Sequence, residues 1–143
     1  MPDQLISDAN LLAQFSQMYR TAIDTFMEKV GMFRGQGLVL CQVVKQNGMT
    51  QSEIAEALSV QGATITNMLK KMEDANLITR QRDPQDNRLV RVYATQAGIE
   101  LEISIAEQLK SLEASILEGV PEADRDVLRR VLWQMIGNIE KLS

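Results

Sequence analysis

The residues whose types and spacing suggest chemistry lie between positions 50 and 95. Two short β-type runs flank a six-residue polar tip at positions 83–88, where Asp86 and Arg88 stand two residues apart. A carboxylate at this spacing can orient the guanidinium, and a slim planar cation suits the negative potential of a narrow A·T-rich minor groove. The alternative is an ordinary hairpin turn with a local ion pair, which contributes little when it is exposed.

A second polar surface is predicted on a helix over residues 63–76. Ile65, Leu69 and Met72 recur at helical spacing and are expected to face the core. The opposite face carries amide, hydroxyl, methyl and ammonium groups, which suit base edges and phosphates in a major groove. An ordinary solvated helix face is the alternative, but a capped helix, a turn and a basic hairpin in series favour a nucleic-acid surface. The predicted DNA-binding residues are Thr50, Gln51, Gln61, Ala63, Thr64, Asn67, Lys70, Lys71, Arg80, Arg82, Asp86, Arg88 and Arg91.

The charge distribution supports this prediction, although the formal net charge of the chain is −4. Residues 61–91 carry six basic and four acidic side chains, a balance of +2. Residues 1–60 balance to −2 and residues 92–143 to −4. Positive charge is therefore concentrated on the central stretch, and local charge sets the potential that attracts phosphates.

Composition excludes several other classes of function. The chain has no histidine and one cysteine, Cys41, so histidine-based metal sites, catalytic dyads with histidine and an intrachain disulfide are all excluded. Ser52, Glu53, Asp83 and Asp86 offer hydroxyls and carboxylates without the spacing of a base dyad, so we expect no enzyme. No cofactor is expected. At 143 residues and 45% apolar content, without a long apolar run, the chain is predicted to be one cytoplasmic domain without a membrane partner.

The elements that position the polar surfaces are mostly helical. An apolar stripe predicts a first helix that stops near Gly31, and residues 34–37 are expected to form a flexible lead-in to residues 38–44. That apolar run is predicted to be a buried helix, with a strand as the alternative. Thr50 and Glu53 form a T-x-x-E capping box for a short helix, and residues 59–62 break it.

Strands are predicted over residues 77–82 and 89–93, and Thr95 is expected to cap a long helix. That helix is expected to end near residues 119–121, with Pro121 in the first turn of the next. In the last helix the predicted inner stripe is Leu128, Val131, Leu132, Met135, Ile139 and Leu142. Trp133 lies off this stripe. A large exposed aromatic side chain on a terminal helix indicates a second face that is buried elsewhere, which predicts a subunit interface.

This order of elements resembles the MarR (multiple antibiotic resistance regulator) family over almost the whole chain. The most specific similarity lies in the hairpin, where Asp86 and Arg88 occupy the D-x-R positions of that family's wing, and Thr95 and Gly98 those of its L-T-x-x-G run. Ala94 replaces the usual Leu, and Asn76 stands where Gly commonly ends the recognition helix; Asn tolerates the same left-handed geometry.

The resemblance implies a mainly α fold with a small β-hairpin wing. It implies a winged helix-turn-helix lobe over residues 34–95 and dimerisation helices over 1–30 and 99–143, within a single domain of 1–143. It also implies a homodimer that acts as a transcriptional regulator on a double-stranded DNA operator. The family leans to repression, with release from a pseudo-palindromic operator by a small-molecule effector.

A small apolar or aromatic anion is the expected effector, under the first helix near Phe15, Met18, Tyr19, Phe33 and Arg34; plain core packing is the alternative for these residues. The peroxide-sensing branch of the family carries a reactive cysteine at a position that resembles Ser16 here, so that chemistry is not expected. Cys41 lies in an apolar run, where inert thiols are common. The rival function is a winged helix that docks proteins without reading DNA, but such a module has no need for Arg88 and a basic hairpin.

Overall fold

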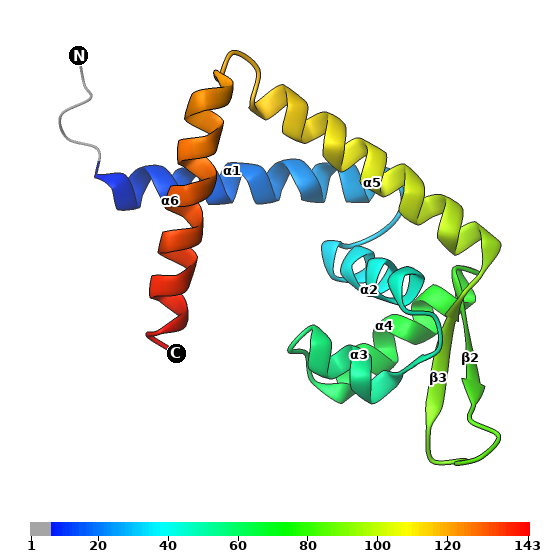
Figure 1. Cartoon of the computed structure of the whole chain (residues 1–143). Helices are drawn as coiled ribbons and strands as arrows, with labels where there is room; N and C mark the ends of the chain where they lie inside the picture. The colour runs from blue at the N-terminus through cyan, green and yellow to red at the C-terminus, as the bar shows by residue number, and fades with distance from the viewer. Residues whose placement is uncertain (1–6) are drawn as a thin grey trace. The chain divides into compact units, whose positions relative to one another are not determined.

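The computed structural model describes residues 7–143, and Figure 1 shows the course of the chain. The predicted first dimerisation segment therefore begins outside the described residues, at positions 1–6. In chain order the elements are α1 (Asp8–Lys29), α2 (Arg34–Lys45), β1 (Met49–Thr50), α3 (Gln51–Ala57), α4 (Gly62–Asp74), β2 (Ile78–Arg82), β3 (Val90–Ala94), α5 (Gln96–Ile116) and α6 (Glu122–Glu140). The mainly α fold with a small β-hairpin wing is confirmed. In the described part, no helix combines the length and apolar character needed to span a bilayer.

Helix α1 begins at a serine cap and ends before a glycine turn. The Ser7 hydroxyl accepts a hydrogen bond from the Asn10 amide at 3.2 Å. Gly31 has φ +73°, a left-handed conformation that glycine adopts without strain, so the predicted stop is confirmed. Much of the apolar face of α1 is exposed, including Phe15 and Met18.

Helix α2 confirms the predicted buried helix, but the prediction of a flexible lead-in is wrong. Residues 34–37 form the first turn of α2, where the Gln36 side chain accepts a hydrogen bond from the Phe33 amide at 2.9 Å. The glycines there serve packing: a Cβ on Gly37 would lie 2.6 Å from the Met27 Cε atom. A glycine in a helix costs about 1 kcal/mol relative to alanine, and here it admits a core side chain.

Helices α3 and α4 form the predicted pair. Thr50 Oγ1 accepts from the Glu53 amide at 3.1 Å, and the Glu53 carboxylate accepts from the Thr50 amide at 2.9 Å, so the capping box is confirmed. The chain turns between the helices through Ser59, which has φ +53°. Asn76 follows α4 with φ +60°, in the left-handed geometry expected of the residue that replaces glycine there.

The sheet has the order β1-β3-β2 and is antiparallel, with β2 at one edge. Both predicted hairpin strands are confirmed to within one residue at each end. The two-residue strand β1 was not predicted, because Met49 and Thr50 show no alternating pattern and pair only with Val92 and Arg91 of β3. In Figure 1 the hairpin loop extends beyond α3 and α4 from the base where β2 and β3 join the helices.

Two junctions fix the start of α5. Thr95 Oγ1 accepts from the Gly98 amide at 3.0 Å and donates to the Asn76 carbonyl at 2.7 Å, which confirms Thr95 as a cap. Gly98 is buried so closely against the preceding segment that a Cβ would lie 2.1 Å from the Leu77 carbonyl oxygen. The T-x-x-G motif therefore joins the end of α4 to α5.

The described residues divide into two compact units, 7–107 and 108–143, and α5 runs from one into the other. In the second unit, Pro121 is the N-cap of α6 and precedes its first turn by one position. Helix α6 has no buried residue in the described structure, and Leu128, Val131 and Leu132 of the predicted inner stripe are exposed. Trp133 is 72% exposed, as its position off the stripe predicted.

Candidate nucleic-acid interface and effector pocket

Helix α4 has one buried face and one polar, exposed face. Ile65, Leu69 and Met72 are 0%, 0% and 1% exposed, so the core face is as predicted. These three anchors fix the rotation of the helix about its axis, and the polar residues must then face outward. The exposed set is Gln61, Ala63, Thr64, Asn67, Lys70 and Lys71. Amide, methyl and ammonium groups thus share one surface with the geometry that a major groove accepts.

Thr50 and Gln51 do not belong to this exposed surface. Thr50 is 6% exposed and its hydroxyl is engaged in the cap of α3, so the structure gives it a structural role, and its DNA contact stays a prediction. Gln51 is half-buried, and its amide lies 3.5 Å from both the Thr66 hydroxyl and a guanidinium nitrogen of Arg80. The polar groups of both residues therefore bind neighbouring elements of the lobe.

The hairpin tip presents Arg88 as a held and exposed cation. Its Nε and Nη2 atoms each donate to Asp86, at 3.0 Å, and its backbone amide donates to the same carboxylate at 3.1 Å. The Arg88 side chain is nevertheless 89% exposed. Hydrogen bonds from Arg88 hold the pKa of Asp86 below its ordinary value, so the pair stays ionised at neutral pH. The predicted orientation of Arg88 by Asp86 is present in the structure.

Arg91 has a different environment from the one predicted. Its Nε donates to Asp83 at 2.6 Å and its Nη1 to the Gly48 carbonyl at 2.9 Å. The other oxygen of Asp83 accepts from the amides of Gln85 and Asp86, at 2.7 and 3.1 Å. The hydrogen bond from Arg91 is the main cause that lowers the pKa of Asp83. This arginine therefore shapes the tip and ties it to the loop before β1, a role that residue type alone did not reveal.

Arg80 and Arg82 also bind within the chain. Arg82 donates to the Asn87 carbonyl at 2.7 Å, across the base of the tip, and remains exposed. Arg80 is half-buried and pairs with Glu73 of α4 at 3.1 Å. Sequence reasoning missed Glu73, because its partner lies seven residues away across a helix-to-strand break that no helical or strand period connects.

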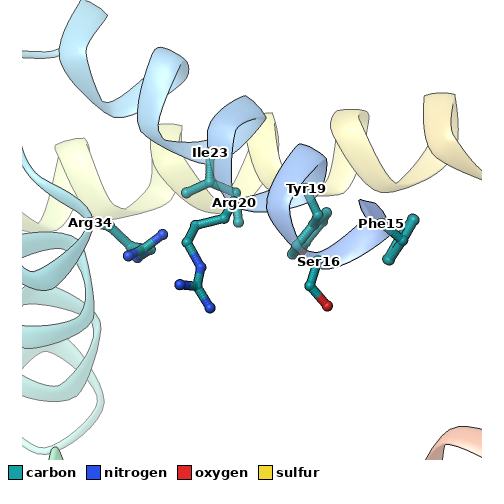
Figure 2. Close-up of a pocket in the computed structure, with 6 residues that line it drawn as sticks. All are labelled: Phe15, Ser16, Tyr19, Arg20, Ile23 and Arg34. Atoms are coloured by element: carbon teal, nitrogen blue, oxygen red, sulfur yellow. The ribbon is translucent and has the colours of Figure 1, made fainter. Parts of the chain in front are cut away.

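A pocket of about 490 Å³ lies against α1 and the start of α2. Its lining residues are Phe15, Ser16, Tyr19, Arg20, Ile23 and Arg34. In Figure 2, Arg20 extends from α1 on the side where Arg34 projects from α2, and Phe15 and Tyr19 follow along α1. The two rings stack with centroids 5.9 Å apart and planes 13° apart. Two guanidinium groups beside stacked rings suit an aromatic anion.

The structure brings together three of the five predicted effector residues: Phe15, Tyr19 and Arg34. Met18 and Phe33 do not line this pocket; Phe33 is 72% exposed and lines two other cavities, of about 360 and 330 Å³. Arg20 was missed, although it follows Ser16 by one helical turn and could have been found from that spacing. Arg34 also lies 3.4 Å from Asp24. Among residues 7–143, no cluster of three or more acidic or cysteine side chains could hold a metal ion.

The chain is similar to known transcriptional regulators. The model of the MarR family matches residues 34–90. The organic hydroperoxide resistance transcriptional regulator of Bacillus subtilis is 30% identical over 130 residues, which cover 90% of this chain and 83% of that protein. The transcriptional repressor MdtR of the same organism is 34% identical over 98 residues, 67% of this chain and 63% of that one.

Solved structures are similar over nearly the full chain. MepR, a transcription regulator of the Staphylococcus aureus multidrug efflux pump MepA, has a TM-score of 0.81 at 25% identity, covering 93% of this chain and 98% of that chain. A point mutant of MepR, bound to an oligodeoxyribonucleotide, has a TM-score of 0.69 at 26% identity with the same coverage. The segment matched by the family model contains α4, β2 and the tip of the hairpin, and it ends at the first residue of β3.

Proposed function

Because this chain belongs to the MarR family of transcriptional regulators, we propose that it binds a pseudo-palindromic DNA operator as a homodimer, represses transcription there, and leaves it when a small-molecule effector binds. Like the relatives that it matches, it is a transcriptional regulator and not an enzyme. The observation that carries the proposal is the wing tip, where Asp86 holds an Arg88 that is 89% exposed, next to a helix with an exposed polar and basic face.

In this proposal α4 enters the major groove. Asn67 can bond adenine through its amide, and the methyl groups of Ala63 and Thr64 can contact thymine methyls. Gln61 and Lys70 flank these residues on the exposed face, and Lys71 adds a charge for phosphate. A good bidentate contact is worth about 1–3 kcal/mol of discrimination against the wrong base, so Asn67 is the proposed main reader.

Arg88 is proposed to enter the neighbouring minor groove, where a narrow A·T-rich segment favours an inserted guanidinium. Asp86 reduces the conformational entropy that Arg88 loses on binding DNA, because the Nε and Nη2 atoms of the guanidinium are already hydrogen-bonded to Asp86. Arg82 lies at the base of the tip, exposed, and is the proposed phosphate contact beside it.

The first and last two helices are proposed to form the dimer, and residues 34–95 the DNA-binding lobe. Support comes from α6, where large apolar side chains are exposed: Val127, Leu128, Val131, Leu132, Trp133, Ile136 and Ile139. Monomeric proteins rarely expose so much contiguous apolar surface, and a second copy of the same helices would bury it. The dimer would set the two copies of α4 about 34–36 Å apart, the spacing of successive major grooves.

Effector release is proposed to act through the pocket between α1 and α2. An aromatic anion there would place its carboxylate between Arg20 and Arg34 and its ring beside Tyr19. Because α1 belongs to the proposed dimer and α2 to the proposed DNA-binding lobe, a ligand that joins them would change the spacing of the two recognition helices. Ser16 lines the same pocket where the peroxide-sensing branch carries its cysteine, so the proposed signal is binding and not oxidation.

The test of DNA binding is the salt dependence of affinity for Arg88→Ala. Each neutralised phosphate contributes about 0.9 to the slope of log K against log salt, and loss of Arg88 is expected to lower both the affinity and this slope. Lys141→Ala, which removes one positive charge outside residues 61–91, is the control and should change neither. Equal affinity and slope for wild type and Arg88→Ala would contradict the proposed role of the wing.

The test of the effector pocket is thermal stabilisation by a panel of phenolic acids. Arg20→Gln should abolish the stabilisation that wild type gains, and Arg130→Gln, at an exposed arginine of α6, should keep it. A compound that stabilises wild type and Arg20→Gln equally would place the effector elsewhere. A panel in which no compound stabilises wild type removes the support for this class of effector.

A further inference from the structure

Arg80 occupies a position at which the hairpin meets both helices of the helix-turn-helix. Its Nη2 atom lies 3.1 Å from one oxygen of Glu73, and its backbone amide donates to the other oxygen at 3.0 Å. Its Nη1 atom lies 3.5 Å from the side-chain oxygen of Gln51 on α3. The Arg80 side chain is 23% exposed, against 89% for Arg88. The guanidinium of Arg80 thus faces the protein, whereas that of Arg88 faces solvent.

Glu73 performs two tasks in this arrangement. Strand β2 is an edge of the sheet, and the amide of Arg80 that Glu73 binds is directed to a helix and not to β3. A single carboxylate therefore satisfies an edge-strand amide and an arginine on the same strand. Because two different groups of β2 are bound, the contact resists rotation of the strand as well as its separation from α4.

Gln51 extends the contact to a third element. Its amide nitrogen lies 3.5 Å from the Thr66 hydroxyl of α4, while its oxygen faces Arg80 of β2. We name the three residues Gln51, Glu73 and Arg80 the wing clamp. Its members come from α3, α4 and β2, which are the three elements whose relative orientation decides whether one DNA duplex can meet both the recognition helix and the wing.

We propose that the wing clamp sets the angle of the hairpin relative to α4, so that Arg88 and the exposed face of α4 can engage one duplex together, and that Arg80 is a positioning residue and not a phosphate contact. This inference rests on the proposed DNA-binding function. It assigns a role to Glu73, whose carboxylate on a DNA-binding helix would otherwise only repel phosphate.

Geometry explains why the angle matters. Arg80 and the start of the tip at Asp83 are three residues apart, which is about 10 Å of strand at roughly 3.3 Å per residue. A rotation of about 10° at Arg80 would displace the tip by about 2 Å, which is enough to break a hydrogen bond of about 3 Å. Arg91 of β3 binds Gly48, in the loop before β1, and its bond to Asp83 ties the end of β2 to β3. Loss of the wing clamp would therefore remove contacts of the hairpin with α3 and α4 while its contact with Gly48 remains.

The test compares Glu73→Gln and Arg80→Gln, singly and together, for affinity and salt slope on a DNA site selected by the wild-type protein. The wing clamp predicts that each single change weakens binding about five- to tenfold and that the double change weakens it no further. The salt slope should stay at the wild-type value, because the complex still forms with Arg88 in the groove and only the fraction of free protein with the hairpin at that angle falls. Glu73→Gln is the sharpest arm, because removal of a negative charge near DNA would strengthen binding if Glu73 acted by charge alone.

A distance measurement separates positioning from a loss of stability. With Cys41 replaced by serine, nitroxide labels at Glu56→Cys on α3 and Gln85→Cys at the tip report the angle of the hairpin by pulsed electron paramagnetic resonance; both positions are exposed. The Glu73→Gln change should broaden or shift this distance distribution while the thermal unfolding temperature falls by only a few degrees. An unchanged distribution together with weaker binding would overturn the positioning role.

The remaining outcomes are also decisive. A salt slope that drops by about one for Arg80→Gln, with Glu73→Gln binding as well as or better than wild type, would make Arg80 a phosphate contact and overturn the inference. In both cases Arg88→Ala still loses affinity and slope, so the proposed function stands. If wild type selects no DNA site, or Arg88→Ala binds like wild type, the proposed function fails first.

Discussion

Gly98 offers the most direct check of how the DNA-binding lobe joins α5. In Gly98→Ala the new Cβ would lie 2.1 Å from the Leu77 carbonyl oxygen. A Cβ atom essentially never comes within 3.0 Å of another residue's atoms, so the backbone must move. That carbonyl also accepts from the Thr95 amide at 3.1 Å, and Thr95 in turn caps α5. Movement of Leu77 therefore strains the junction between α4, β3 and α5 together.

The magnitude follows from opposing effects. Overpacking costs about 1–3 kcal/mol and a weakened buried hydrogen bond about 1 kcal/mol. Replacing a helical glycine by alanine raises the free energy of unfolding by about 1 kcal/mol through helix propensity. The net expectation is a loss of about 2 kcal/mol in the free energy of unfolding, or roughly 6–8 °C in the unfolding temperature for a chain of this length.

Thermal unfolding followed by circular dichroism at fixed protein concentration measures this change. Gly62→Ala is the matched control, because a Cβ there meets nothing within 4 Å, and its unfolding temperature should equal that of wild type or exceed it slightly. If Gly98→Ala unfolds within about 1 °C of wild type, a small fraction of the expected shift, the close approach to Leu77 does not constrain the junction and the reasoning is refuted.

Three further predictions concern the cap, the wing and the pocket. Thr50→Ala should lower the free energy of unfolding by about 1 kcal/mol in urea titrations, since the cap of α3 is lost, and should leave the salt slope of DNA binding unchanged; a lowered slope would support Thr50 as a DNA contact. Hydrogen bonds in the folded tip lower the pKa of Asp83 below its ordinary value of 3.8, so its contribution to stability is present above that pH and is lost as pH falls through the folded pKa. Asp83→Asn should therefore flatten the pH dependence of stability below about pH 4 and weaken DNA binding at neutral pH; an unchanged acid profile would contradict the role of the pair with Arg91. Arg34→Gln should weaken binding of a phenolic acid in calorimetric titration without changing DNA affinity in the absence of effector, and equal effector affinity would exclude Arg34 from the pocket.

Much of the fold could be predicted because its signals are local. The capping box at Thr50, the periodicity of Ile65, Leu69 and Met72, and the turn at Asn76 each depend on residues within one or two helical turns. The hairpin tip was predictable for the same reason, since Asp86 and Arg88 are two residues apart. These signals agree with one another, which is what a sequence that specifies one fold should show.

The sequence did not reveal contacts between residues that lie far apart in the chain. Gly35 and Gly37 suggested flexibility, whereas they allow Met68 and Met27 to approach α2. Arg80 and Arg91 were assigned to DNA by their charge, but carboxylates seven and eight residues away engage both. The type of a side chain shows which partners it is able to bind, but only the fold shows which partners within the chain lie close enough to bind it.

In the pocket, too, some lining residues were predictable from the sequence and others were not. Phe15, Tyr19 and Arg34 were predicted from type and order, and they do line one cavity. Arg20 is a second guanidinium in the lining and was missed, although it lies one helical turn after Ser16, which lines the same cavity. Phe33 was predicted to lie near the same effector, but it does not line this cavity: it is the N-cap residue of α2 and faces solvent.

Selection of bound sites from a random pool of double-stranded DNA tests the central claim most directly. Operator binding by a homodimer predicts enrichment of a pseudo-palindrome whose half-sites are about 10–10.5 base pairs apart, with A·T pairs where the wings reach the minor groove. Loss of the A·T preference in a parallel selection with Arg88→Ala would assign those positions to the wing. A pool that remains random with the wild-type protein, or a single unpaired half-site, would contradict operator binding by a dimer of this chain.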